Sequence, residues 1–83
     1  MKVRIKYFAS IREAIGQPGE TRETQAGTLA ALRDELISAG EPYAHCLARG
    51  RAVRMAQNQV MSEETAALVD GAEIAFFPPV TGG

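Results

Sequence analysis

The sequence has few of the residues that build metal centres and disulfide frameworks. Its 83 residues include a single cysteine, Cys46, a single histidine, His45, and no tryptophan. One cysteine forms no internal disulfide, and this pair does not supply the four ligands of a structural zinc or iron–sulfur site. We therefore expect no bound metal, no bound cofactor and a reducing, cytoplasmic location.

The sequence also lacks a long apolar run and an excess of charge of one sign. The longest uncharged apolar stretch, IAFFPPV at 74–80, is far shorter than the roughly 20 residues that span a bilayer. The first residues, MKVRIKYF, alternate charge and hydrophobe, unlike the apolar core of a signal peptide. The formal net charge is −1 and the pI is about 5.8, whereas nucleic-acid-binding domains are typically basic. We expect neither a membrane nor a nucleic acid as partner.

The chain is short enough to form only one domain. A domain of this size is expected to bury about 60% of the surface that its unfolded chain exposes, so there is little room for a deep active site. We predict one folded domain over residues 1–77, followed by a flexible tail at 78–83. Function is then expected to depend on surfaces and on the tail.

The first part of the chain predicts a strand, a short helix and an edge strand. Residues 2–8 alternate with period two, which places Val3, Ile5 and Tyr7 on one face and Phe8 on the other face with the basic residues. SIREAIG follows, with Ser10 as predicted N-cap, Glu13 at the capping-box position and Gly16 as the stop. The polar residues 20–25 suit an exposed edge strand that pairs with the first.

A helical pattern begins at Thr28 and ends before Gly40 and Pro42. Its apolar face is predicted to contain Leu29, Leu32, Leu36 and Ile37. Residues 43–48 are expected to add a short helical segment, and Val53 and Met55 are expected to face inward from a strand at 51–57.

The last strand is predicted over residues 72–77, after a turn at Asp70-Gly71. Its alternation places Ile74 and Phe76 inward and Ala75 and Phe77 outward. The predicted fold class is therefore α+β, a small sheet with one main helix packed on one face and the other face open.

The end of the chain, FFPPVTGG, has a composition suited to insertion into another protein. Pro78 and Pro79 end the strand and stiffen the exit, and Val80, Thr81, Gly82 and Gly83 follow. The six residues 78–83 reach roughly 20 Å when extended. Glycine passes through narrow channels and leaves a terminal carboxylate unhindered. A frayed end or a cloning remnant is the alternative explanation.

Three stretches of the sequence are similar to parts of one known family. YFASIRE at 7–13 is similar to the family's first strand and turn, and NQ at 58–59 is similar to its mid-chain turn. DGAEIAFFPPVTGG at 70–83 resembles its C-terminal signature and is the specific match. By these stretches the chain resembles the small ubiquitin-like sulfur-carrier subunits of molybdopterin synthase. The resemblance covers essentially the whole chain and implies a β-grasp, ubiquitin-like fold.

The resemblance also implies a mechanism in which this subunit has no activity alone. An E1-like adenylyltransferase would use ATP and magnesium to adenylate the Gly83 carboxylate. A persulfide sulfur donor would then convert Gly83 to 1-thioglycine, a thiocarboxylate. The carrier would dock on the large subunit, in a heterotetramer of two small and two large subunits, and donate sulfur to cyclic pyranopterin monophosphate to build a dithiolene.

Phe8 and Phe77 lie at outward positions of strands that are neighbours in a β-grasp sheet, so they are candidates for an exposed docking patch. By resemblance Met61 is a third candidate. Arg12 is a candidate for pairing with acidic partner residues, together with Arg4, Lys6 and Arg54. The alternatives are rings covered by loops of this chain and charges that are simply solvated.

Other chemically suggestive residues are expected to be structural. His45 and Cys46 are adjacent, but sequence neighbours rarely face each other as a base and a nucleophile, so Cys46 is interpreted as a small core or boundary residue. The acidic pairs at 34–35 and 63–64 are expected to be solvated.

Three other functions remain open. A thiamine-pathway sulfur carrier and a ubiquitin-like protein modifier would share the activated Gly83. A noncatalytic β-grasp binding module would not use the tail.

Overall fold

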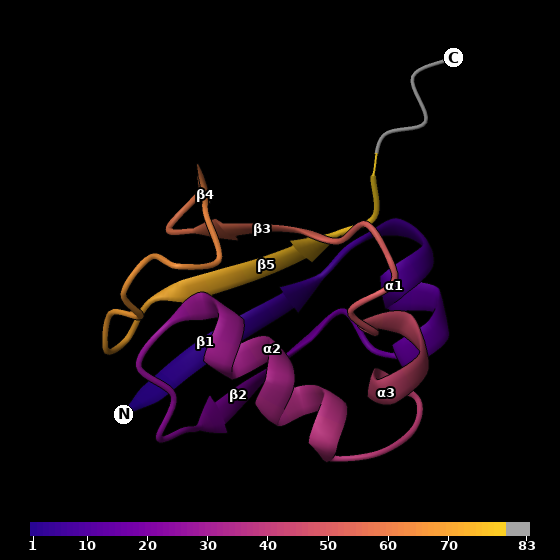
Figure 1. Ribbon diagram of the computed structural model, residues 1–83, viewed down its shortest axis with the longest axis horizontal. Helices are drawn as coiled ribbons and strands as arrows, with labels where there is room; N and C mark the ends of the chain where they lie inside the picture. The colour runs from indigo at the N-terminus through magenta and orange to yellow at the C-terminus, as the bar shows by residue number, and fades with distance from the viewer. Residues whose placement is uncertain (80–83) are drawn as a thin grey trace.

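The computed structural model describes residues 1–79 and shows a five-stranded sheet with helices packed against it (Figure 1). The strands are β1 (Lys2–Tyr7), β2 (Gly19–Glu23), β3 (Arg54–Gln57), β4 (Val60–Ser62) and β5 (Glu73–Phe77). The helices are α1 (Ala9–Ile15), α2 (Leu29–Ser38) and α3 (Tyr43–Cys46). Of the predicted tail, Pro78 and Pro79 are described, and residues 80–83 lie outside the described residues.

The sheet is mixed, with strand order β2-β1-β5-β3-β4. β1 and β5 are parallel neighbours at its centre, and the other adjacent pairs are antiparallel. β2 is an edge strand that pairs with β1, as the polar composition of residues 20–25 predicted. The first and last strands of the chain therefore lie side by side, and this pairing confirms the predicted α+β arrangement.

Side-chain alternation along β1 separates the core from the open face. Val3, Ile5 and Tyr7 are at most 1% exposed, whereas Lys2 and Lys6 are exposed. In β5, Ile74 and Phe76 join the core as predicted. Ala75 is not part of that core cluster, but it is only 5% exposed. The register partners of Ala75 are Lys6 in β1 and Ala56 in β3.

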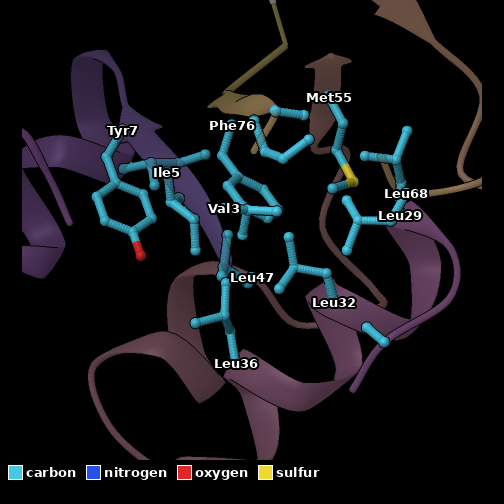
Figure 2. Packing of buried hydrophobic residues seen from close by; sticks show 14 of the residues in the cluster. Val3, Ile5, Tyr7, Leu29, Leu32, Leu36, Leu47, Met55, Leu68 and Phe76 are labelled. Carbon is cyan, nitrogen blue, oxygen red and sulfur yellow. The ribbon is translucent and has the colours of Figure 1, made fainter. Parts of the chain in front are cut away.

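Helix α2 covers the core face of the sheet. The Thr28 side chain accepts a hydrogen bond from the backbone N–H of Ala31 at 3.1 Å, an N-cap contact at the residue where the helical pattern was predicted to begin. Leu29, Leu32 and Leu36 are fully buried. Figure 2 shows them pointing towards side chains of the sheet. The prediction for Ile37 was only partly right, because this residue is half-buried at the edge of the cluster.

The N-cap prediction for α1 was wrong. The cap is Phe8, whose carbonyl accepts from the backbone N–H groups of Ile11 and Arg12 at 3.2 and 3.3 Å, and Ser10 lies inside the helix. Ala9 has a φ of 51°, a left-handed conformation that turns the chain directly from β1 into the helix. Gly16 ends α1 in the left-handed conformation, with a φ of 86°, as predicted.

Strand β4 was not predicted. It pairs with β3 through a tight turn in which Asn58 and Gln59 both have positive φ, at 51° and 69°. Two positive φ values are typical of hairpin turns, but β4 is only 3 residues long and has no clear alternation. The predicted strand at 51–57 is shorter than expected, and Val53 precedes it as a half-buried residue.

Three of the four acidic residues expected to be solvated are instead paired, whereas Glu63 is exposed and forms no ion pair within residues 1–79. Glu64 contacts the guanidinium groups of Arg33 and Arg49, and Arg49 also contacts Asp34. Glu35 pairs with Arg22. Within residues 1–79, no helix is long and apolar enough to cross a membrane.

Candidate functional site

An apolar patch lies at the end of the sheet from which the chain continues towards its C-terminus. We call Phe8, Met61 and Phe77 the aromatic patch. The rings of Phe8 and Phe77 stack with centroids 4.7 Å apart and planes inclined by 11°. Phe8 is 39% exposed and Met61 is 54% exposed, whereas Phe77 is half-buried. The prediction that both rings face outward as neighbours is consistent with this geometry.

The parallel pairing of β1 with β5 brings the two rings together. Tyr7 is the register partner of Phe76, so the next residue of each strand, Phe8 and Phe77, emerges at the same end. The backbone N–H of Phe8 donates to the carbonyl of Phe76 at 3.2 Å and fixes this relation. A side-chain period of two then turns both rings away from the core.

A hollow of about 450 Å³ lies beside the aromatic patch. It is lined by Phe8, Ala9, Arg54, Met61, Phe77, Pro78 and Pro79. Apolar hollows with exposed rings are typical of protein docking sites. The role of Ala9 was not predictable from the sequence, because alanine gives no signal for a left-handed turn.

The candidate cations occupy different parts of the surface. Arg54 is the register partner of Phe77 and lines the hollow. Lys6 is on the open face, where its ammonium group lies 3.4 Å from the carboxylate of Glu73. Arg12 is exposed on α1 and does not line the hollow. Arg54 thus lies beside the aromatic patch. Pairing of Arg12 with acidic residues of a partner stays a prediction.

The tail starts directly at this patch. Pro78 and Pro79 follow the last residue of β5 and form part of the wall of the hollow. The predicted tail residues Val80, Thr81 and Gly82 lie outside the described residues, and so does Gly83, the predicted site of the chemistry. A protein that covers the aromatic patch would lie next to the start of the tail.

His45 and Cys46 do not form a nucleophile–base pair. The Nε2 atom of His45 lies 2.9 Å from a guanidinium nitrogen of Arg51, and the Cys46 thiol lies 4.0 Å from the carbonyl of Tyr43. Cys46 is 7% exposed, and burial raises the pKa of its thiol. Cys46 is therefore a core residue, as predicted.

Two tyrosines near the core share a carboxylate. The hydroxyls of Tyr7 and Tyr43 donate to the same oxygen of Glu20 at 2.7 and 2.6 Å. Burial, together with the bond to Glu20, raises the pKa of Tyr7 well above its usual range, so this hydroxyl stays protonated. Residues 1–79 hold no group of three or more His, Cys, Asp or Glu side chains placed to bind a metal ion.

Comparison with known proteins gives one consistent family. The model of the ThiS family matches residues 5–83. The chain is 38% identical to the molybdopterin synthase sulfur carrier subunit of Haemophilus influenzae, over 98% of this chain and 99% of the relative.

Solved structures agree with this fold. Subunits 1 and 2 of the molybdopterin-converting factor from Helicobacter pylori form a solved complex, in which the matching chain has a TM-score of 0.66 and 26% identity, with 100% of both chains covered. Small archaeal modifier protein 1 from Haloferax volcanii has a TM-score of 0.77 and 23% identity, with 95% of this chain and 98% of that chain covered. At 23% identity, the similarity to the Haloferax volcanii protein concerns the fold alone.

Proposed function

The chain belongs to the ThiS family, among the molybdopterin synthase sulfur carrier subunits, and we propose that it carries sulfur on the carboxyl carbon of Gly83. The observation that supports this most directly is the position of the tail. Pro78 and Pro79 leave β5 beside the aromatic patch, so a protein docked there would receive the residues that follow. The family match extends through residue 83.

The first step of the proposed chemistry activates Gly83. In an E1-like adenylyltransferase, a Gly83 carboxylate oxygen attacks the α-phosphate of magnesium-bound ATP, which releases pyrophosphate and leaves an acyl adenylate. The terminal sulfur of a protein persulfide then attacks the carbonyl carbon, and AMP leaves. A thiol cleaves the resulting sulfur–sulfur bond and becomes oxidised to a disulfide, so that Gly83 keeps one sulfur as a thiocarboxylate.

The second step delivers the sulfur. The carrier docks through the aromatic patch on the large subunit, in an assembly of two small and two large subunits. The tail then presents the thiocarboxylate, which is ionised and nucleophilic at neutral pH, to cyclic pyranopterin monophosphate. Two deliveries build the dithiolene. The catalytic acids, bases and phosphate-binding groups belong to the partners, so the carrier alone has no activity. We place this reaction in the cytoplasm.

The test is the intact mass of the chain after incubation with an E1-like enzyme and magnesium ATP. We expect an adenylyl adduct, and with a persulfide donor and a thiol also present we expect one oxygen to be replaced by one sulfur. Deleting Gly83 shifts the carboxylate back by about 3.3 Å and is expected to abolish sulfur transfer. Gly82→Val is expected to impair it, because a β-branched side chain obstructs a narrow channel.

The matched control is Phe77→Glu, which leaves the tail intact but places a charge in the aromatic patch. We expect this variant to bind the large subunit more weakly while keeping its fold.

High-mass conjugates on lysines of other proteins, without sulfur exchange, would indicate a protein modifier instead. Transfer to a thiazole synthase but not to the large subunit would indicate the thiamine pathway, and no adduct with any cognate enzyme would indicate a binding module.

A further inference from the structure

A second hollow, of about 370 Å³, adjoins the aromatic patch. Its walls come from α1, α3, residues 51–53 and the two prolines that begin the tail. Helices α1 and α3 pack against each other below the end of β5 (Figure 1). Pro78 and Pro79 line both hollows, so a protein that covers the aromatic patch reaches the second hollow across the prolines.

The second hollow combines apolar walls with one arginine at its mouth, and the Glu41 carboxylate lies beside the lining, where it accepts from the backbone N–H of His45 at 3.1 Å. Ile11 and Cys46 are buried and Val53 is half-buried, and these three residues supply apolar surface. Arg51 and His45 are exposed residues of the same lining. No Asp or Glu is among the described residues that line either hollow.

The backbone that carries Arg51 is held in place by a buried cation. The Arg33 side chain, which is 3% exposed, donates to the carbonyls of Leu47, Ala48 and Arg51 at 2.8, 2.7 and 3.1 Å. Within residues 1–79, the Arg51 guanidinium itself has only His45 as a side-chain partner. Because a guanidinium has five N–H donors, Arg51 retains donors for a carboxylate.

We propose that the second hollow receives an acidic segment of the large subunit, with an aliphatic side chain against Ile11 and Val53 and a carboxylate on Arg51. The inference rests on the proposed function, since the same partner must cover the aromatic patch. Two features favour this occupant: the two prolines connect the hollow to the aromatic patch, and the Arg51 guanidinium retains donors for a carboxylate. A second copy of this chain would bring the same guanidinium to this position.

The test is the affinity of the full-length carrier for its cognate large subunit. Arg51→Glu is expected to raise the Kd by about tenfold or more and to reduce its dependence on salt. Lys2→Glu is the control, because it changes the net charge equally but lies about 20 Å from Phe8 at the other end of β1. We expect it to change the Kd by less than about threefold.

A second variant tests the hollow without changing charge. Ala14 is an exposed residue of α1 that lines the hollow, and Ala14→Gln partly fills it while keeping good helix propensity. This variant is also expected to weaken binding. An unchanged thermal midpoint in both variants shows that they remain folded.

The outcomes separate this inference from the proposed function. If Phe77→Glu raises the Kd for the large subunit but Arg51→Glu raises it no more than Lys2→Glu does, the proposal for the second hollow is overturned. The aromatic patch then remains the docking surface. If Phe77→Glu binds the large subunit with the wild-type Kd, both the docking patch and the second hollow are overturned as binding surfaces. A dimer of the wild-type chain that Arg51→Glu dissociates assigns the hollow to a second copy. Binding of inorganic phosphate at Arg51, with unchanged affinity for the large subunit, assigns it to a small anion, and either result overturns the proposal.

Discussion

Glu35 shows how a single carboxylate on α2 connects the helix to the sheet edge. It accepts hydrogen bonds from the Arg22 guanidinium at 2.6 Å and from the Thr24 hydroxyl at 2.7 Å. Burial opposes the negative charge, but the hydrogen bonds from Arg22 and Thr24 outweigh it and hold the pKa of Glu35 below its usual value. The ionised form is therefore favoured by folding.

This contact predicts a pH-dependent loss of stability. A lowered folded pKa gives stability that is present above the unfolded pKa, about 4.3 for Glu, and that is lost as pH falls through the folded pKa. We expect Glu35→Gln to lower the free energy of unfolding by about 1 kcal/mol at pH 7. The difference from the wild type should shrink as the pH falls below about 4, and urea titrations across this range measure it.

The exposed Glu13→Gln is the control for this experiment, since Glu13 lies on the solvent side of α1. At pH 7 it is expected to change the free energy of unfolding by less than about 0.5 kcal/mol, because the side chain is exposed. An equal destabilisation by Glu35→Gln at pH 3 and pH 7 would mean that packing of the side chain, rather than its charge, stabilises the fold.

Single residues were predicted well where strand alternation determined their direction. Val3, Ile5 and Tyr7 are buried, and Phe8 and Phe77 are neighbours, because a period of two fixes both faces once a strand is recognised. The ionic contacts were missed because their partners are distant in sequence: Arg33 and Glu64 are 31 positions apart and meet only after the chain has folded.

At the scale of elements, the orientation of α2 predicts different stability losses for two isomeric side chains that differ in burial. The sequence placed Leu36 and Ile37 on the same apolar face, but Leu36 is fully buried and Ile37 is half-buried. Leu36→Ala and Ile37→Ala remove an equal number of carbon atoms. We expect Leu36→Ala to cost about 2 to 5 kcal/mol of unfolding free energy, and Ile37→Ala to cost clearly less. Denaturant midpoints compare the two, and equal losses would show that the helix is rotated differently.

The elements differed in how well the sequence predicted them. The prediction of α2 combined a leucine period with a stop at Gly40 and Pro42, and the structure confirms this helix. β4 has only 3 residues and is held by pairing with β3, so local sequence carried little signal for it. The start of α1 depends on a left-handed alanine at position 9, which no propensity rule favours.

At the scale of the whole molecule, folding and the proposed chemistry occupy separate parts of the chain. Within residues 1–79, the buried hydrophobic cluster extends from Val3 to Phe76 and the last strand ends at Phe77. We therefore expect the fold not to depend on the residues that we propose to carry sulfur.

This separation predicts that a chain ending at Pro79 folds normally and acts as an inhibitor. We expect its free energy of unfolding to differ from that of the full chain by less than about 0.5 kcal/mol. Because it keeps the aromatic patch, it should compete with the full-length carrier for the large subunit. Added in excess, it should reduce sulfur transfer in a reaction that contains preformed thiocarboxylate, and the rate of dithiolene formation measures this.

The same truncated chain carrying Phe77→Glu is the matched control, since it lacks both the tail and an intact patch. It is expected to leave the transfer rate unchanged, because a carboxylate in the stacked pair of rings would have to be desolvated on docking. If neither truncated chain inhibits while the full-length carrier binds, then the affinity comes from residues 80–83 rather than from the sheet. In that case the tail is the main recognition element, and the aromatic patch only adjoins it.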